Sequence, residues 1–248
     1  MRTRVLVGSL LSALAGIGVA IVVSACQSSY AKNDELEKEG ATILKAEKGV
    51  NVTQTSSIVD VLNTTVLSNA NGAAVVVTLK NNSQQALRNV PIEINVKDAK
   101  GKSVFKNTSP GLEPALTSVP VMRPGETVDW VNDQILASGE PKSVDVKVGV
   151  SQESLPPNAP VLEASDAKLV VDPYSGIQAE GKVTNDSDIP QVRVTLFAVA
   201  RKGNQIVAAG RGGIKVIKAN GDRPYHIYFI GNPKGADVTV TVPPSTFE

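Results

Sequence analysis

Residues 77–83 read Val-Thr-Leu-Lys-Asn-Asn-Ser, and residues 181–187 read Gly-Lys-Val-Thr-Asn-Asp-Ser. In each stretch an alternating segment, typical of a half-buried strand, runs into a cluster of Asn, Asp and Ser that is typical of a turn. From residue 77 to residue 181 the offset is 104 residues. We therefore predict that the chain contains two similar β units, each built around one of these strand-and-turn segments.

Alternation of period two extends outward from both segments. The first unit has it at residues 75–80, 92–97 and 144–150, and the second at 178–184, 192–198 and 238–242. We expect one set of alternate residues in each strand, which is aliphatic, to face a core. The other set is mostly polar, includes Val76 and Phe197, and is expected to face the other side. Glycine-containing turns are expected at residues 98–102 and 201–204.

The pattern therefore predicts an all-β fold. Each unit offers about seven strand candidates and no amphipathic helix of useful length, which favours two tandem immunoglobulin-like antiparallel β-sandwich domains. We expect the domains to span residues 57–153 and 161–248. The segment 154–160, Ser-Leu-Pro-Pro-Asn-Ala-Pro, is expected to be the linker, because its prolines cannot continue a sheet.

Composition excludes several classes of protein. The 248 residues carry 25 Lys and Arg against 24 Asp and Glu, so the net charge of +1 argues against a nucleic-acid partner. Apolar residues make up 42% and aromatic residues 4%, so the core must consist mainly of Val, Ile, Leu and Ala. The single cysteine excludes an intramolecular disulfide and a multi-cysteine metal site.

The leader indicates where the protein lies in the cell. Arg2 and Arg4 precede an uncharged apolar run at residues 5–25, and the run ends in Val23-Ser24-Ala25-Cys26. This ending resembles the lipobox of bacterial lipoproteins. The resemblance implies a signal peptide at 1–25, lipidation of Cys26 with diacylglycerol and palmitate, and a protein anchored on the extracytoplasmic face of the cell membrane. The alternative is that residues 5–25 remain as a signal anchor. Residues 26–56 are polar and are expected to form a flexible tether.

The two units also resemble the FxLyD-type domains of bacterial surface lipoproteins. The tyrosine-aspartate pair that helps to name that family is absent, and the first unit is the more divergent, with Val77 in the glycine position and Trp130 as its late aromatic. The resemblance implies an extracytoplasmic immunoglobulin-like fold with no established catalytic activity. It rests, in the second unit, on Gly181-Lys-Val-Thr-Asn185, residues 192–196, Gly203, and Gly221-Asp222 before Tyr225.

Two residues, His226 and Trp130, are candidates for a functional role. His226 is the only histidine, and alternation predicts that it points with Tyr228 away from the core, which favours a role on the strand face over a catalytic one. Trp130 could stack on a ligand, but a sandwich core often buries one tryptophan, so core packing is favoured.

Two polar or glycine-rich segments were weighed in the same way. Residues 185–188, Asn-Asp-Ser-Asp, could contribute to a calcium site, but a turn that bonds its own backbone is the favoured interpretation. Residues 210–213, Gly-Arg-Gly-Gly, are expected to form a glycine hairpin and not a phosphate loop. We expect no cofactor, metal site or catalytic residue, and the sequence identifies no binding residues.

The function favoured by these observations is that of a membrane-anchored, non-enzymatic interaction or adhesion module that binds a protein of the cell envelope, without nucleic acid. The alternative is an accessory lipoprotein that binds a small ligand or ion at a site between the two domains. A polar pocket lined by both units around residues 151–160 would favour that alternative.

Overall fold

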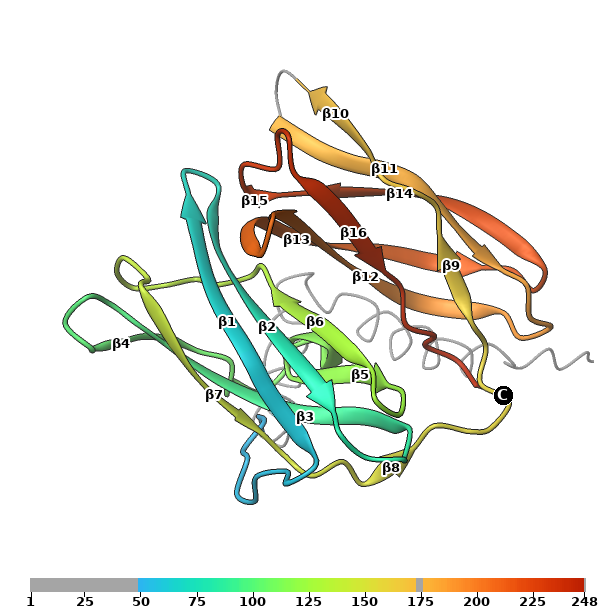
Figure 1. Cartoon of the computed structure of the whole chain (residues 1–248), viewed down its shortest axis with the longest axis horizontal. Helices are drawn as coiled ribbons and strands as arrows, with labels where there is room; N and C mark the ends of the chain where they lie inside the picture. The colour runs from blue at the N-terminus through green and yellow to red at the C-terminus, as the bar shows by residue number, and fades with distance from the viewer. Residues whose placement is uncertain (1–48, 173–175, 248) are drawn as a thin grey trace, which may run out of the picture. The chain divides into compact units, whose positions relative to one another are not determined.

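The computed structural model describes residues 49–172 and 176–247, and these consist of antiparallel strands with one short 3₁₀ turn (Figure 1). The prediction of an all-β fold is therefore confirmed. The predicted signal peptide, the predicted lipidation site Cys26 and residues 27–48 of the predicted tether lie outside the described residues. For description we call β1–β8 the first sheet pair and β9–β16 the second sheet pair.

The first sheet pair consists of two facing sheets. One has the order β1-β2-β6, and in the other the long strand β3 pairs with all four remaining strands. The elements are β1 (Val59–Asn69), β2 (Gly72–Asn81), β3 (Leu87–Lys97), β4 (Ser103–Lys106), a 3₁₀ turn (Pro114–Leu116), β5 (Ser118–Met122), β6 (Thr127–Asn132), β7 (Ser143–Val148) and β8 (Glu153–Ser154).

The second sheet pair repeats this plan. One sheet has the order β10-β11-β14, with β9 also pairing with β11, and the other has the order β15-β13-β12-β16. The elements are β9 (Leu162–Ala164), β10 (Lys168–Asp172), β11 (Gly176–Asn185), β12 (Gln191–Lys202), β13 (Gln205–Ile217), β14 (Gly221–Tyr228), β15 (Ile230–Gly231) and β16 (Asp237–Thr241).

The two segments that are 104 residues apart make the same turn. Asn81 and Asn185 are both fully buried at the ends of β2 and β11. The Oδ1 of Asn81 accepts hydrogen bonds from the backbone N–H and hydroxyl of Ser83, and the Oδ1 of Asn185 accepts the same pair from Ser187. Each Nδ2 donates to the backbone carbonyl four residues further on, at Gln85 in the first turn. The same local chemistry thus starts the loop to the next strand in both sheet pairs.

Alternation predicts the core positions of the strands but not the surroundings of their other faces. In β2, Val75 and Val77 face the core of the first sheet pair, and Val77 pairs with the buried Trp130. Val76, expected on a half-exposed face, is also fully buried. Phe197 of β12, expected beside polar residues on the outer side, is 4% exposed. The expectation that these faces meet solvent is therefore wrong at both strands.

The reason is that the two sheet pairs pack on each other. Strands β12 and β13 contact β6, and β13 also contacts β1 and β2. Leu196 and Ala198 lie in the core of the second sheet pair, whereas Phe197 and Val199 join the apolar cluster of the first. Both faces of β12 are therefore covered, which removes the polar side expected of a half-buried strand.

Ion pairs border this packing. The Nη2 of Arg201 on β12 lies 2.6 Å from the Oδ2 of Asp129 on β6, and the hydroxyl of Thr78 donates to the other oxygen of that carboxylate at 2.7 Å. Residues 155–161 between β8 and β9 contain no strand, and the N–H of Ala159 donates to the carbonyl of Pro156. The domain boundary predicted in this stretch stays a prediction.

Candidate functional site

The predicted orientation of His226 is confirmed. Tyr225, Ile227 and Phe229 are buried, whereas the side chains of His226 and Tyr228 are on the opposite face of the sheet. The Nδ1 of His226 lies 3.5 Å from the Oε1 of Glu180 on the neighbouring strand β11. His226 is therefore a strand-face residue with one carboxylate neighbour.

The outer face of the sheet β10-β11-β14 also presents one aromatic and one aliphatic side chain near this pair. Val170, Gln178 and Tyr228 lie in one row across the three strands, and Tyr228 is 52% exposed. In the next row Lys168, Glu180 and His226 lie opposite one another. We call these six residues the tyrosine face. Its single large aromatic lies on the edge strand β14, and the nearly buried Gln178 of β11 separates it from the half-exposed Val170 of β10. The next row carries charges of both signs.

Trp130 is a core residue, as predicted. It is 1% exposed, and its indole N–H donates to the carbonyls of Ala115 and Ser118 at 2.8 and 3.2 Å. These bonds satisfy the one polar group of the ring, so that Trp130 can be buried without an unpaired donor. It offers no stacking surface to a ligand.

The Asn185–Asp188 segment forms the favoured turn. Asn185 and Ser187 bond backbone groups of the segment itself, and Asp188 accepts a hydrogen bond from the side chain of Asn220 at 2.8 Å. Across residues 49–172 and 176–247 no three His, Cys, Asp or Glu side chains come together as a metal site would require. In the same residues no helix is long and apolar enough to span a membrane.

The glycine hairpin predicted at residues 210–213 is wrong. These residues lie inside β13, where Gly210 pairs with Ala198 and Gly212 with Leu196. A Cβ at Gly210 would lie 2.0 Å from the carbonyl oxygen of Tyr228, and one at Gly212 would lie 2.8 Å from Ile227. The glycines therefore allow the backbone of β14 to approach β13 closely, which is a known use of glycine within a strand.

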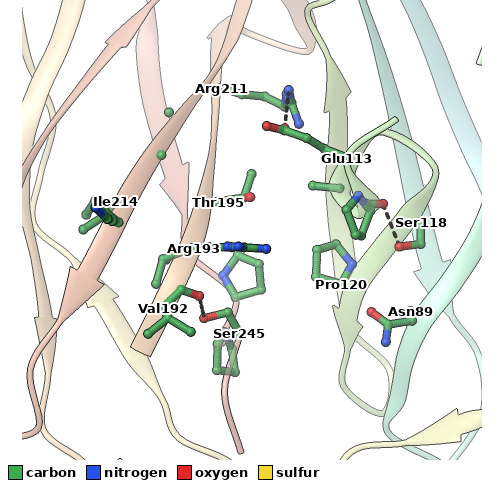
Figure 2. Close-up of a pocket in the computed structure, with 18 of the residues that line it drawn as sticks. Asn89, Glu113, Ser118, Pro120, Val192, Arg193, Thr195, Arg211, Ile214 and Ser245 are labelled. Carbon is green, nitrogen blue, oxygen red and sulfur yellow. Dashed lines mark hydrogen bonds and ion pairs between the residues drawn. The ribbon is translucent and has the colours of Figure 1, made fainter. Parts of the chain in front are cut away.

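A cavity of about 820 Å³ lies between the two sheet pairs (Figure 2). Both sheet pairs and the C-terminal segment after β16 line it. None of residues 151–160 is among its lining residues, so this cavity is not the hinge pocket that would favour the ligand-binding alternative. The charged residues of the lining are Arg88, Glu113, Asp133, Arg193, Arg211 and Lys215.

Arg211 is the most buried of these charges, with 6% of its side chain exposed. Its Nε donates to the Oδ1 of Asp133 at 2.9 Å, and its backbone N–H donates to the Oδ2 at 2.8 Å. Its Nη2 lies 3.5 Å from the Oε2 of Glu113. Its Nη1 is buried and has no hydrogen-bond partner in the described part of the chain. A buried polar nitrogen without a partner is rare in folded proteins.

Arg193 extends into the middle of the cavity toward Pro120 (Figure 2). Its backbone φ is +53°, a left-handed conformation that residues other than Gly, Asn and Asp rarely adopt. Asn89, 104 positions earlier, has a φ of +48° and also lines the cavity. The two sheet pairs therefore present the same backbone feature to one cavity, but with different side chains.

The phenol of Tyr225 is electrostatically perturbed by its surroundings. Burial raises the pKa of its phenol above the ordinary value of 10.0, and the carboxylate of Asp166 raises it further. The hydroxyl donates to the carbonyl of Ser165 at 3.2 Å, and the ring covers Gly181, where a Cβ would lie 2.4 Å from the hydroxyl oxygen. This arrangement is part of the core and reaches neither the tyrosine face nor the cavity.

Sequence reasoning did not identify Arg193 or Arg211 as site residues. Arg193 was assigned to the polar face of its strand, and Arg211 was read only as part of a glycine-rich segment. An arginine between glycines inside a strand is a usable signal, because the glycines bring other backbone close to it.

Protein-family models give no match to this chain, and a search of curated proteins likewise gives none. The resemblances to the lipobox and to FxLyD-type domains stay predictions.

Proposed function

We propose that the protein is a lipid-anchored module on the extracytoplasmic face of the cell membrane that binds another protein of the cell envelope and has no catalytic activity. The observation that carries the proposal is the tyrosine face, a sheet face with an exposed aromatic residue, Tyr228, on its edge strand β14. The lipobox resemblance at Cys26 supports the location, and both of its implications, the anchor and the compartment, belong to the proposal.

The composition of the tyrosine face supports protein binding. Tyrosine is enriched among the residues that contribute most to binding energy, because it supplies a large rigid area together with a polar hydroxyl. Tyr228 is 52% exposed and Val170 37% exposed, and they lie in the same row across the sheet. The mixed charges of the next row provide the polar rim that such interfaces have.

In the other sheet of the second sheet pair, β15-β13-β12-β16, the outer face packs on the first sheet pair. Phe197 and Val199 of β12 pack on the first sheet pair, with Arg201 paired to Asp129 at the border. The tyrosine face belongs to the opposite sheet, so a partner could dock there without disturbing that packing. The packing of the two sheet pairs and the proposed docking face therefore use different sheets of the second sheet pair.

The test is photo-crosslinking on living cells. A photoreactive amino acid replaces Tyr228 in one version of the full-length protein and Lys147 in another, because Lys147 lies on the outer face of the first sheet pair and 57% of its side chain is exposed. We expect one defined envelope protein to be captured from position 228 and not from position 147. The purified partner should then bind Tyr228→Ala at least about tenfold more weakly than the unaltered protein.

Two controls make the test decisive. Cys26→Ser removes the proposed anchor and is expected to abolish capture by releasing the protein from the membrane. Equal capture from positions 228 and 147, or binding unaffected by Tyr228→Ala, would contradict the proposal.

The cavity between the sheet pairs supports a second candidate function, the binding of a small ligand. The specific observation is the buried guanidinium of Arg211, whose Nη1 has no partner among the described residues. A volume of about 820 Å³ is within the range of ligand sites, which is roughly 300 to 1,000 Å³.

A further inference from the structure

We infer that the cavity between the sheet pairs binds a small organic anion, with Arg193 as the residue that holds its carboxylate or phosphate group. This inference rests on the second candidate function and is independent of the tyrosine face. The cations of the cavity carry the argument, because they exceed the carboxylates that can neutralise them.

Both carboxylates of the cavity already contact the same arginine, Arg211. Asp133 receives the Nε and the backbone N–H of Arg211, and Glu113 lies 3.5 Å from the Nη2 of the same guanidinium. Arg88, a third arginine of the lining, has its own partner in Glu153 at 3.2 Å and lies 4.1 Å from the centre of the Phe247 ring. These contacts leave Arg193 and Lys215 as the cavity cations with no carboxylate within ion-pair distance in the described part of the chain.

Arg193 and Lys215 lie at the same level of the neighbouring strands β12 and β13. The register pairs Val192 with Val216 and Val194 with Ile214, and the left-handed φ of Arg193 interrupts the ladder between these two pairs. Like charges on neighbouring strands repel each other. An anion bound beside both side chains would remove this repulsion, and an arginine fork is well suited to grip a carboxylate or a phosphate with two hydrogen bonds.

The left-handed backbone conformation at Arg193 indicates a functional role for its side chain. In the first sheet pair the left-handed position is occupied by Asn89, a residue type that tolerates this conformation, and its amide donates to Glu153 at 2.9 Å. In the second sheet pair an arginine occupies it at a cost in backbone strain. Strained residues of this kind concentrate at functional sites, and here the strain directs a guanidinium into the cavity (Figure 2).

The remaining lining defines the rest of the ligand. Apolar side chains surround the cations, so the organic part of the anion would lie against rings and aliphatic groups. The cavity is also much larger than an inorganic ion needs. The apolar lining includes Pro120, Val192, Ile214, Pro243 and Phe247.

The experiment measures binding of two probe anions to the purified full-length protein by calorimetry. 4-Phenylbutyrate carries a carboxylate and phenyl phosphate a phosphate, and the uncharged 4-phenylbutanamide is the matched control. We expect saturable binding of at least one anion, and the stronger of the two identifies the preferred oxyanion. The amide should bind at least about tenfold more weakly, and raising the salt concentration should weaken the anions alone.

The variants separate a binding role from a structural one. Arg193→Asn reproduces the residue of the first sheet pair, so it should keep or raise the melting temperature while weakening anion binding by about tenfold or more. Arg193→Lys should retain part of the affinity, and Lys147→Asn, which removes a distant cation, should have no effect. Tyr228→Ala should leave anion binding unchanged, which distinguishes a failure here from a failure of the docking face. The inference is overturned if neither anion binds better than the amide, or if Arg193→Asn binds the anion as the unaltered protein does.

Discussion

The two sheet pairs share a construction but differ in what their outer sheets present. On the first sheet pair, Glu93 and Lys97 of β3 form cross-strand ion pairs with Lys147 and Asp145 of β7. On the second, the tyrosine face lies on the sheet β10-β11-β14, which corresponds to the sheet β1-β2-β6 of the first sheet pair and not to the sheet of β3. A row of paired charges is well solvated and resists association, whereas an exposed aromatic side chain favours it. The comparison indicates that the two sheet pairs share a frame but present different side chains on their outer faces.

The largest expected effect concerns the contact between the sheet pairs. Phe197→Ala should lower the free energy of unfolding by about 3–5 kcal/mol, because the phenyl ring is almost fully buried against the first sheet pair. Urea unfolding followed by intrinsic fluorescence measures this. Phe197→Leu, which keeps most of the volume, should cost less than about 1.5 kcal/mol. A loss below about 1 kcal/mol for Phe197→Ala would show that the two sheet pairs are not held together by this ring.

Replacing the buried asparagine of either shared turn should lower the free energy of unfolding almost as much as Phe197→Ala does. The loss should be larger in the first turn than in the second. Asn81 donates to three backbone carbonyls, those of Gln85, Met122 and Arg123, whereas Asn185 donates to two, those of Ile189 and Lys218. Each buried carbonyl that loses its partner costs about 1–3 kcal/mol. Asn81→Ala is therefore expected to destabilise the protein by about 3 kcal/mol or more, and Asn185→Ala by somewhat less. Chemical denaturation of both variants provides the ranking, and the reverse order would contradict a ranking set by the number of donated hydrogen bonds.

The next prediction concerns the close approach of β14 to β13, a feature of the second sheet pair that depends on the glycines of β13. Gly210→Ala should destabilise by about 1–3 kcal/mol or more, since the new Cβ meets the carbonyl oxygen of Tyr228. Gly213→Ala is the matched control, because the nearest atom would lie 4.0 Å from its Cβ. Differential scanning calorimetry should find the second variant as stable as the original protein. Similar melting temperatures for the two variants would contradict the close approach of β14.

The smallest effect is expected at Tyr225. The pKa of its phenol is raised in the folded protein, so its contribution to stability is fully present below the ordinary value of 10.0 and is lost as the pH rises through the raised value. Tyr225→Phe should cost about 0.5–1.5 kcal/mol at neutral pH, from the hydrogen bond to Ser165, and should reduce the loss of stability above about pH 10. Unfolding at a series of pH values measures both. An unchanged alkaline slope in Tyr225→Phe would assign the slope to other groups.

The sequence was sufficient to predict the all-β fold, the orientation of His226 and the burial of Trp130, because period-two alternation reports the core face of each strand directly. It was insufficient at β2 and β12, where Ala73–Val77 and Leu196–Ala200 are continuous apolar runs. Such runs indicate burial on both faces. Reading them as alternation overlooked the contact between the sheet pairs and, with it, the cavity that this contact encloses.

The charged cavity could not have been predicted from local patterns. Arg88 and Asn89 are more than 100 residues from Arg193 in the chain, and only the packing of the two sheet pairs brings them to one cavity. The prediction of a hairpin at residues 210–213 was wrong for a related reason. Glycine permits a turn, but it also permits close backbone contact, and the strand that makes this contact is not adjacent in sequence.

The central claim is that the second sheet pair docks a partner outside the membrane while the first does not. The most direct measurement is labelling of living cells with a membrane-impermeant maleimide, using Tyr228→Cys and Lys147→Cys in the full-length protein. In the purified protein both thiols should react at similar rates, because both positions are about half exposed.

On cells, we expect the thiol at position 147 to react fully and the thiol at position 228 to react at least about tenfold more slowly, because the partner covers the tyrosine face. Equal reaction of both thiols on cells would contradict the docking face. Failure of both to react on intact cells, with recovery after lysis, would contradict the extracytoplasmic location.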